Sequence, residues 1–143
     1  IINIDDYLMT QFMEKVKNKQ AQMFGMAWGA DYPDAQNFLQ LFYGPFESPG
    51  PNNANYHNTE YDSLYDEMKV MLPGPERDAV IRKMLEILYE DCPWSFTDHR
   101  IKYSYFHSWL KNYKYNDLEP WAFKYYGVDA EAKRRYRTSE GAR

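Results

Sequence analysis

Apolar residues recur along the chain with two spacings, one typical of helices and one typical of strands. A helix is predicted over 7–17, because four apolar residues there repeat as one helix face does: Met9, Phe12, Met13 and Val16. The alternating start at 2–4 and the mostly apolar run at 21–28 predict strands on either side of this helix. A strand, a helix and a strand within about thirty residues predict a βαβ unit with parallel strands.

The middle of the chain predicts three further helices and one long loop. A short helix is expected over 35–42, and the Pro- and Gly-rich segment 43–54 is a loop of the length that binding loops and lids often have. Asn58 or Thr59 caps the next helix, which a Pro-Gly-Pro break separates from a last helix over 75–89. Two helices across so short a break predict a helical hairpin.

The last third of the chain has a weaker pattern. Partial alternation predicts a strand over 94–105, and the aromatic-rich stretch 103–126 follows no clean period. The segment 129–143 contains five basic and three acidic residues and almost no apolar ones, which predicts a solvated tail. Together these elements predict an α/β fold.

Composition narrows the classes of function. The 143 residues are 44% apolar and 27% charged, which allows a packed core. A net charge of −4 argues against a nucleic-acid binder, which needs a basic face. The sequence contains no run of about 20 apolar residues, the length that a membrane-spanning helix needs. The single cysteine, Cys92, excludes an internal disulfide and a multi-cysteine zinc site, and we expect it to be a small buried residue. Because the chain begins at Ile1 inside a strand-like run, we expect it to be a portion of a longer protein.

Two classes of function stay open on the residues alone. The sequence motifs of zinc proteases, phosphate-binding loops and α/β-hydrolases are absent. A small hydrolase that uses Asp31 with Asp34, or His99, as its catalytic groups is one hypothesis. A protein-interaction module is another, because aromatic residues make up 18% of the chain and suit a recognition surface.

Asp31 has the most informative position among the charged residues. It lies three residues past the expected strand 21–28, close to Trp28 and Tyr32. In open α/β sheets ligands bind beyond the carboxyl ends of the strands, so this carboxylate would attract an ammonium or hydroxyl group of a ligand. The alternative is that Asp31 caps the following turn through backbone hydrogen bonds.

The segment MAWGADYPDA, 26–35, resembles the W-x-A-D-Y-P-D-P segment of the extracellular solute-binding proteins of family 5, the oligopeptide- and dipeptide-binding proteins of ABC importers. The resemblance continues in the same order through five more segments: Asn37-Phe38-Leu39, Asn52-Asn53-Ala54-Asn55-Tyr56, Asn58-Thr59-Glu60-Tyr61-Asp62-Ser63-Leu64, Glu76-Arg77 and Leu88-Tyr89-Glu90-Asp91-Cys92-Pro93. This chain differs from the family segment at Ala35, where a second Pro is common. The difference affects the stiffness of the loop more than its chemistry.

The resemblance implies a two-lobed binding protein that closes over its ligand, with this chain as its C-terminal portion. It implies that Asp31 pairs with the N-terminal ammonium of a bound peptide. The main chain around 27–29 is expected to bond the extended peptide as an added strand does. The other expected ligand contacts are Ala27, Trp28, Gly29, Tyr32 and Asn53.

The same resemblance implies domains, partners and location. Residues 1–93 are expected to belong to the C-terminal lobe of a periplasmic-binding-protein type II-like fold, 94–128 to cross back toward an N-terminal lobe, and 129–143 to form a polar tail. The implied partners are a peptide or similar solute, that N-terminal lobe and the ABC permease subunits. The implied location is periplasmic or extracellular, with a lipid anchor as a variant. No catalytic residue, metal, cofactor or nucleic acid is implied, and family members that carry sugars, haem or nickel complexes leave those ligands open.

Overall fold

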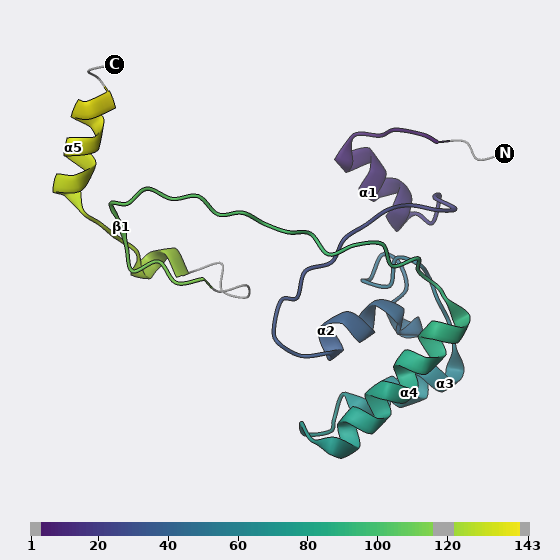
Figure 1. The fold of residues 1–143 in the computed structure, drawn as a ribbon. Helices are drawn as coiled ribbons and strands as arrows, with labels where there is room; N and C mark the ends of the chain where they lie inside the picture. The colour runs from purple at the N-terminus through teal and green to yellow at the C-terminus, as the bar shows by residue number, and fades with distance from the viewer. Residues whose placement is uncertain (1–3, 116–121, 141–143) are drawn as a thin grey trace. The chain divides into compact units, whose positions relative to one another are not determined.

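The computed structural model of the chain describes residues 4–115 and 122–140. It contains helices and one small two-stranded sheet, and it divides into two compact units, Ile1–Phe96 and Thr97–Arg143 (Figure 1). A mixture of helix and strand is therefore confirmed. Among the described residues, no helix has the length and apolar content that crossing a bilayer requires.

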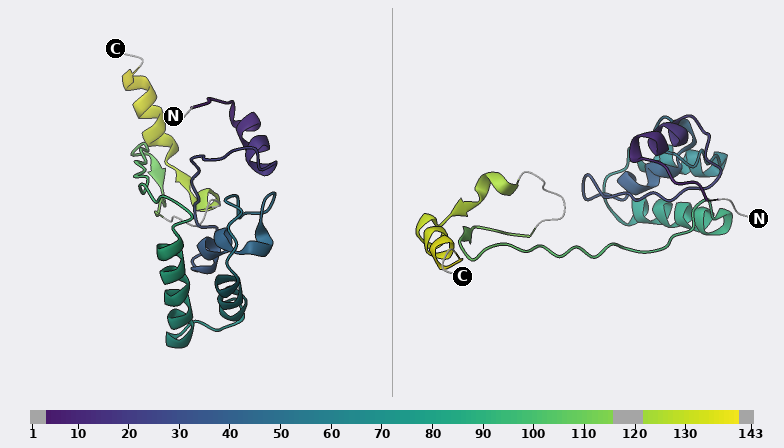
Figure 2. Two further views of the ribbon diagram at one scale, coloured as in Figure 1. Left: turned by 90° about the vertical axis from the view of Figure 1, so that its right-hand side faces the viewer. Right: turned by 90° about the horizontal axis from the view of Figure 1, so that it is seen from above.

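The predicted helical hairpin is confirmed in the first unit. Helix α3 (Thr59–Met68) and helix α4 (Pro75–Asp91) lie side by side (Figure 2). The Asn58 side chain accepts hydrogen bonds from two backbone N–H groups in the first turn of α3, as an N-cap does. Pro75 occupies the first turn of α4, where no helical hydrogen bond needs its missing N–H.

The core of the first unit lies between this hairpin and the short helical segment before it. Helix α2 (Gln36–Leu39) and the 3-10 helix η1 (Gln40–Phe42) form where a short helix was predicted. Ten apolar side chains make one buried cluster: Leu39, Leu41, Phe42, Tyr43, Tyr61, Tyr65, Met68, Val80, Met84 and Leu88. The Tyr61 side chain is completely buried, and its hydroxyl donates a 2.7 Å hydrogen bond to the Leu39 carbonyl. This bond joins α3 to the end of α2.

The loop between η1 and α3 is closed by a buried amide. It contains the 3-10 helix η2 (Gly44–Phe46). Asn52 is completely buried, and its Nδ2 donates to the carbonyls of Tyr43 and Tyr56 at 3.2 and 2.9 Å. Its Oδ1 accepts from the Tyr56 N–H at 3.2 Å. Because a buried amide is stable only when it is bonded, Asn52 fixes both ends of the loop to one another.

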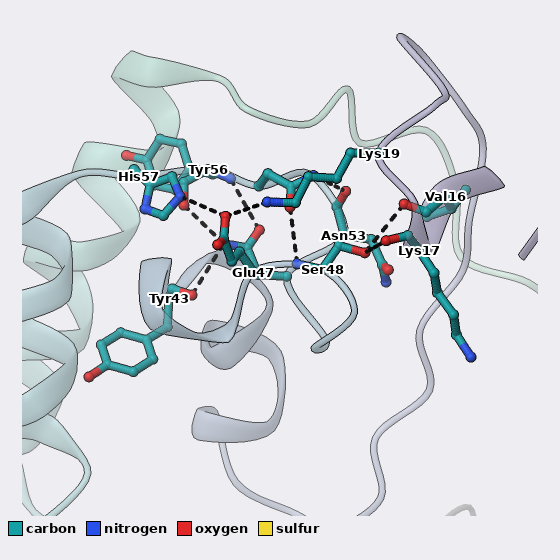
Figure 3. A network of polar contacts seen from close by, with 11 residues as sticks. Val16, Lys17, Lys19, Tyr43, Glu47, Ser48, Asn53, Tyr56 and His57 are labelled. Atoms are coloured by element: carbon teal, nitrogen blue, oxygen red, sulfur yellow. Dashed lines mark hydrogen bonds and ion pairs between the residues drawn. The ribbon is translucent and has the colours of Figure 1, made fainter. Parts of the chain in front are cut away.

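Helix α1 (Met9–Lys17) confirms the predicted N-terminal helix and is attached to this loop at its C-terminal end. The Ser48 hydroxyl donates to the carbonyls of Val16 and Lys17 at 3.3 and 3.1 Å, as Figure 3 shows. The last carbonyls of a helix have no partner within the helix, so a side-chain donor from the loop completes them.

The predicted βαβ unit is wrong for the described residues. The expected strand at 2–4 lies mostly outside them, and 21–28 has no regular secondary structure and bends at 22–23, with Met23 87% exposed. A strand needs a neighbour whose N–H and C=O groups pair with its own. The strands that the structure describes are β1 (Leu110–Lys111) and β2 (Gly127–Val128), and they pair with each other. The apolar run 21–28 therefore has no strand to join.

The second unit contains this antiparallel pair, with Leu110 opposite Val128, and the 3-10 helix η3 (Ala122–Tyr125). The strand predicted over 94–105 is absent, because this segment is extended but unpaired with any described strand. Partial alternation in the sequence identified an extended backbone, but a strand also requires a partner.

Helix α5 (Ala130–Glu140) occupies the region that was expected to be a solvated tail. The Asp129 carboxylate accepts a 2.9 Å hydrogen bond from the backbone N–H of Ala132 in its first turn. Ala, Lys, Arg and Glu are strong helix formers, so a polar segment rich in them forms a helix without an apolar stripe. The prediction considered only the missing apolar residues.

Candidate functional site

The candidate site consists of the segment 27–34 and the start of α2, all within the first unit. Asn37 in α2 is completely buried and lies at its centre. Its Oδ1 accepts from Trp28 Nε1 at 2.8 Å and from the Asp31 backbone N–H at 3.2 Å. Its Nδ2 donates to Asp31 Oδ2 at 3.2 Å. One amide thus holds both the indole and the carboxylate that the sequence suggested for ligand binding.

Asp34 has a structural role instead. Its Oδ1 accepts from the Gln36 N–H at 2.7 Å and from Arg77 Nη2 at 2.7 Å. Arg77 in α4 is buried, and its Nε also donates to the Met68 carbonyl of α3 at 3.3 Å. The hydrogen bond from Arg77 lowers the pKa of the Asp34 carboxyl and outweighs the opposing effect of partial burial. A carboxylate held ionised in this way is a poor general acid.

The surroundings of Asp31 differ from those of Asp34. Asp31 is exposed, and no ion pair in the described parts of the chain involves it. The partner of its carboxylate is the neutral amide of Asn37. The negative charge of Asp31 is therefore balanced by no described cation and is available to a ligand.

The other expected contacts near Asp31 lie on one stretch without regular secondary structure. Ala27, Trp28 and Gly29 are exposed, and within the described residues their backbone groups make no hydrogen bond. Backbone with free N–H and C=O groups is what an added strand requires. The Tyr32 ring is partly exposed, and its hydroxyl donates to Gln36 Oε1 at 2.7 Å.

Asn53 lies apart from these residues in the loop between η1 and α3. Its Nδ2 donates to the Pro51 carbonyl at 3.3 Å, and its own carbonyl accepts from Asn55 Nδ2 at 3.2 Å. Asn55 in turn accepts from the Ser48 N–H at 3.0 Å. The asparagines of this stretch are therefore engaged in closing the loop.

The two remaining candidates, His99 and Cys92, belong to other segments of the chain. His99 is exposed in an extended part of the second unit, and Cys92, expected to be buried, is exposed at the end of α4. Cys92 is the C-cap of α4 and has a left-handed backbone (φ 45°). Among the described residues, no group of three or more His, Cys, Asp or Glu is arranged to hold a metal ion.

Two shallow hollows on the described surface lie elsewhere. One is lined by Arg82, Leu85 and Tyr89 of α4, and the other by Met9 and Met13 of α1. Asp31 lines neither of these two hollows.

Sequence reasoning missed the two residues that organise the site. Asn37 and Arg77 both belong to segments that carry the family resemblance, but neither was given a role. The available signal for Asn37 was a polar residue next to the apolar Phe38-Leu39 pair in a short helix. The partner of Arg77 is 43 positions away, so no local pattern identifies it.

Comparison with known proteins gives two distant relatives. The chain is 24% identical over 127 residues to the heme-binding protein A of Haemophilus influenzae, which covers 89% of this chain and 23% of that protein. It is 23% identical over 92 residues to the oligopeptide-binding protein OppA of Bacillus subtilis, which covers 64% of this chain and 16% of that protein. The chain thus spans less than a quarter of the length of either relative. No protein-family profile matches it, and no solved structure does. Both relatives are named as binding proteins, which favours a binding role over an enzymatic one.

Proposed function

We propose that this chain is part of the ligand-binding component of an ABC importer of solute-binding family 5, and that it captures peptides or similar solutes with a free amino group. Distant similarity to two binding proteins supports the class. In this proposal the protein acts in the periplasm or at the outer cell surface, where a second lobe closes over the ligand and permease subunits receive it. Residues 1–93 belong to the ligand-binding lobe in this reading.

The observation that carries the proposal is the state of Asp31. Asp31 is exposed, its carboxylate is held by a neutral amide, and no described ion pair occupies it. A ligand ammonium at hydrogen-bond distance would form a charge-assisted bond, which is roughly twice as strong as a neutral one. Beside it, the unbonded main chain of 27–29 offers donors and acceptors to an extended backbone.

Haem is the second candidate ligand, because the longer match is to a protein named for binding it. The charge of the first unit favours the amine-bearing ligand. Residues 1–96 contain 15 acidic and 7 basic residues, so their net charge is 7 − 15 = −8. Haem carries carboxylates of its own, and like charges repel. A cationic amino terminus is attracted by the same field.

The test is calorimetry on the protein that carries this chain, with a random tetrapeptide library in free-amine and N-acetylated forms. We expect the free-amine library to bind about tenfold more tightly, and Asp31→Asn to abolish this preference. Asp78→Asn on α4 is the matched control, because it also removes an exposed carboxylate, outside the site, and should leave the preference intact.

Other outcomes identify the alternatives. Equal loss of both libraries in Asp31→Asn would contradict the ammonium role. Saturable binding of haem, followed by its absorbance, without binding of either library would replace peptides by haem. Cleavage of the library that disappears in Asp31→Asn or His99→Ala would establish the hydrolase.

A further inference from the structure

Asn37 combines complete burial with contacts to two residues of the proposed ligand-binding segment. Besides its three side-chain bonds to Trp28 and Asp31, its backbone N–H donates to the Asp34 carbonyl at 3.1 Å. Its carbonyl accepts from Gln40 Nε2 at 3.1 Å. Main chain and side chain are both fixed, so the amide donor meets Asp31 Oδ2 from a rigid support.

An amide at this position has a different effect from a cation. Arg77 holds Asp34 and also neutralises it, because the guanidinium always carries a charge. Asn37 donates a hydrogen bond to Asp31 without adding charge. It therefore restricts the rotation of the carboxylate and leaves its negative charge for another group.

We propose that Asn37 is a positioning residue for ligand recognition: its amide orients the Asp31 carboxylate toward the ammonium group of a bound ligand without placing a second charge beside it. This inference rests on the proposed function of Asp31. It extends that function by assigning the preference for amine-bearing ligands to a buried residue that touches no ligand itself. A carboxylate that is already oriented loses less entropy when the ammonium binds.

Asn52 provides a matched comparison within the same unit. It too is a completely buried asparagine with all its side-chain bonds made inside the protein. Its partners, Tyr43 and Tyr56, belong to the loop between η1 and α3 and not to the candidate site. Replacing either asparagine by Leu removes a buried amide. Only the replacement of Asn37 also removes the hydrogen bond to the Asp31 carboxylate.

The experiment measures the affinity ratio between the free-amine and N-acetylated tetrapeptide libraries. A smaller folded fraction weakens both affinities by the same factor, so the ratio is insensitive to a purely structural defect. We expect Asn37→Leu, and the milder Asn37→Ser, to lower the ratio about fivefold or more, and Asn52→Leu and Asn52→Ser to leave it unchanged. An unchanged ratio in both Asn37 variants would overturn the proposal.

A measurement on the unmodified protein covers the case in which these variants fail to fold. The side-chain NH₂ resonances of Asn37 report on the bond to Asp31, whose acceptor strength falls when an ammonium pairs with it. We expect them to shift with the free-amine library and not with the acetylated one, and identical shifts with both would refute the positioning role. If Asp31→Asn leaves the ratio unchanged, the proposed function fails. If Asp31→Asn lowers the ratio but both Asn37 variants leave it unchanged, the positioning role of Asn37 fails and the proposed function of Asp31 stands.

Discussion

Asp31 and Asp34 are three positions apart in the sequence, and their different partners give them different roles. The sequence suggested both as a pair of catalytic carboxylates, because their residue types and spacing are all that it shows. In the structure, Arg77 neutralises Asp34, whereas Asn37 holds Asp31 without neutralising it. Asn37 lies close to Asp31 in the sequence, but Arg77 comes from a helix 43 positions past Asp34, so the residue types and spacing of the two carboxylates do not show the distinction.

Arg77→Met tests the structural role of the Asp34 ion pair. The variant keeps an apolar side chain of similar length but leaves Asp34 without its cation and the Met68 carbonyl without its donor. We expect the free energy of unfolding in urea to fall by roughly 2–3 kcal/mol, since one partner of a largely buried pair remains uncompensated. Arg82→Met, an exposed position on the same helix, should change it by less than about 0.5 kcal/mol. A similar small effect for both variants would show that the pair contributes little.

The same ion pair predicts a pH dependence of stability. Asp34 has a pKa below its ordinary value because of the Arg77 hydrogen bond. Its contribution is therefore present above about pH 4, the ordinary carboxyl pKa, and is lost as the pH falls from there through the lower folded pKa. Urea unfolding between pH 7 and pH 3 should show a shallower decline below pH 4 in Arg77→Met than in the unchanged protein. If the unfolding free energies of the two proteins fell in parallel with pH, other carboxylates would be responsible for the loss of stability in acid.

Among the secondary-structure elements, the helices whose ends are set by neighbouring residues formed as predicted. The Asn58 cap and the Pro-Gly-Pro break lie beside the helices that they delimit, and the hairpin formed as predicted. The run 21–28 has the composition of a buried strand, but a strand exists only when another strand lies beside it. Helix α5 was missed for the opposite reason, because helix propensity needs no partner and no apolar stripe.

Ser48→Ala tests how α1 is attached to the first unit. The single proton of the Ser48 hydroxyl is shared between the last two carbonyls of α1, and the loss of this bifurcated hydrogen bond removes about 1 kcal/mol. We expect backbone amides within 12–20 to exchange with deuterium about fivefold faster, and those of α3 and α4 to be unchanged. Ser63→Ala, an exposed serine of α3, should affect neither region. Faster exchange throughout the unit would instead indicate that Ser48 supports the whole core.

The whole chain consists of two units with different composition. Every member of the buried cluster lies in the first unit, between Leu39 and Leu88. The first unit is strongly acidic, whereas residues 97–143 contain 10 basic and 6 acidic residues, so their net charge is 10 − 6 = +4. The net charge of the whole chain, −4, conceals this division.

A chain that ends at Phe96 tests whether the first unit carries its own stability. Because the buried cluster is complete within it, we expect a cooperative urea transition of the helical signal at a midpoint close to that of residues 1–143. The reciprocal chain, 97–143, should show no cooperative transition, since none of the cluster lies in it. Loss of the transition in the chain 1–96 would mean that the hairpin core depends on the second unit.

The sequence by itself determined the helices whose caps, breaks and apolar spacing are local: α1, the α2 region, α3 and α4. It also determined the similarity to binding proteins, which depends on the order of short segments, and the special position of Asp31 after Trp28. Only the tertiary structure decided which carboxylate is paired with a cation. That outcome depends on whether a buried amide or a buried guanidinium meets each one, and the guanidinium comes from a helix more than forty residues further along the chain.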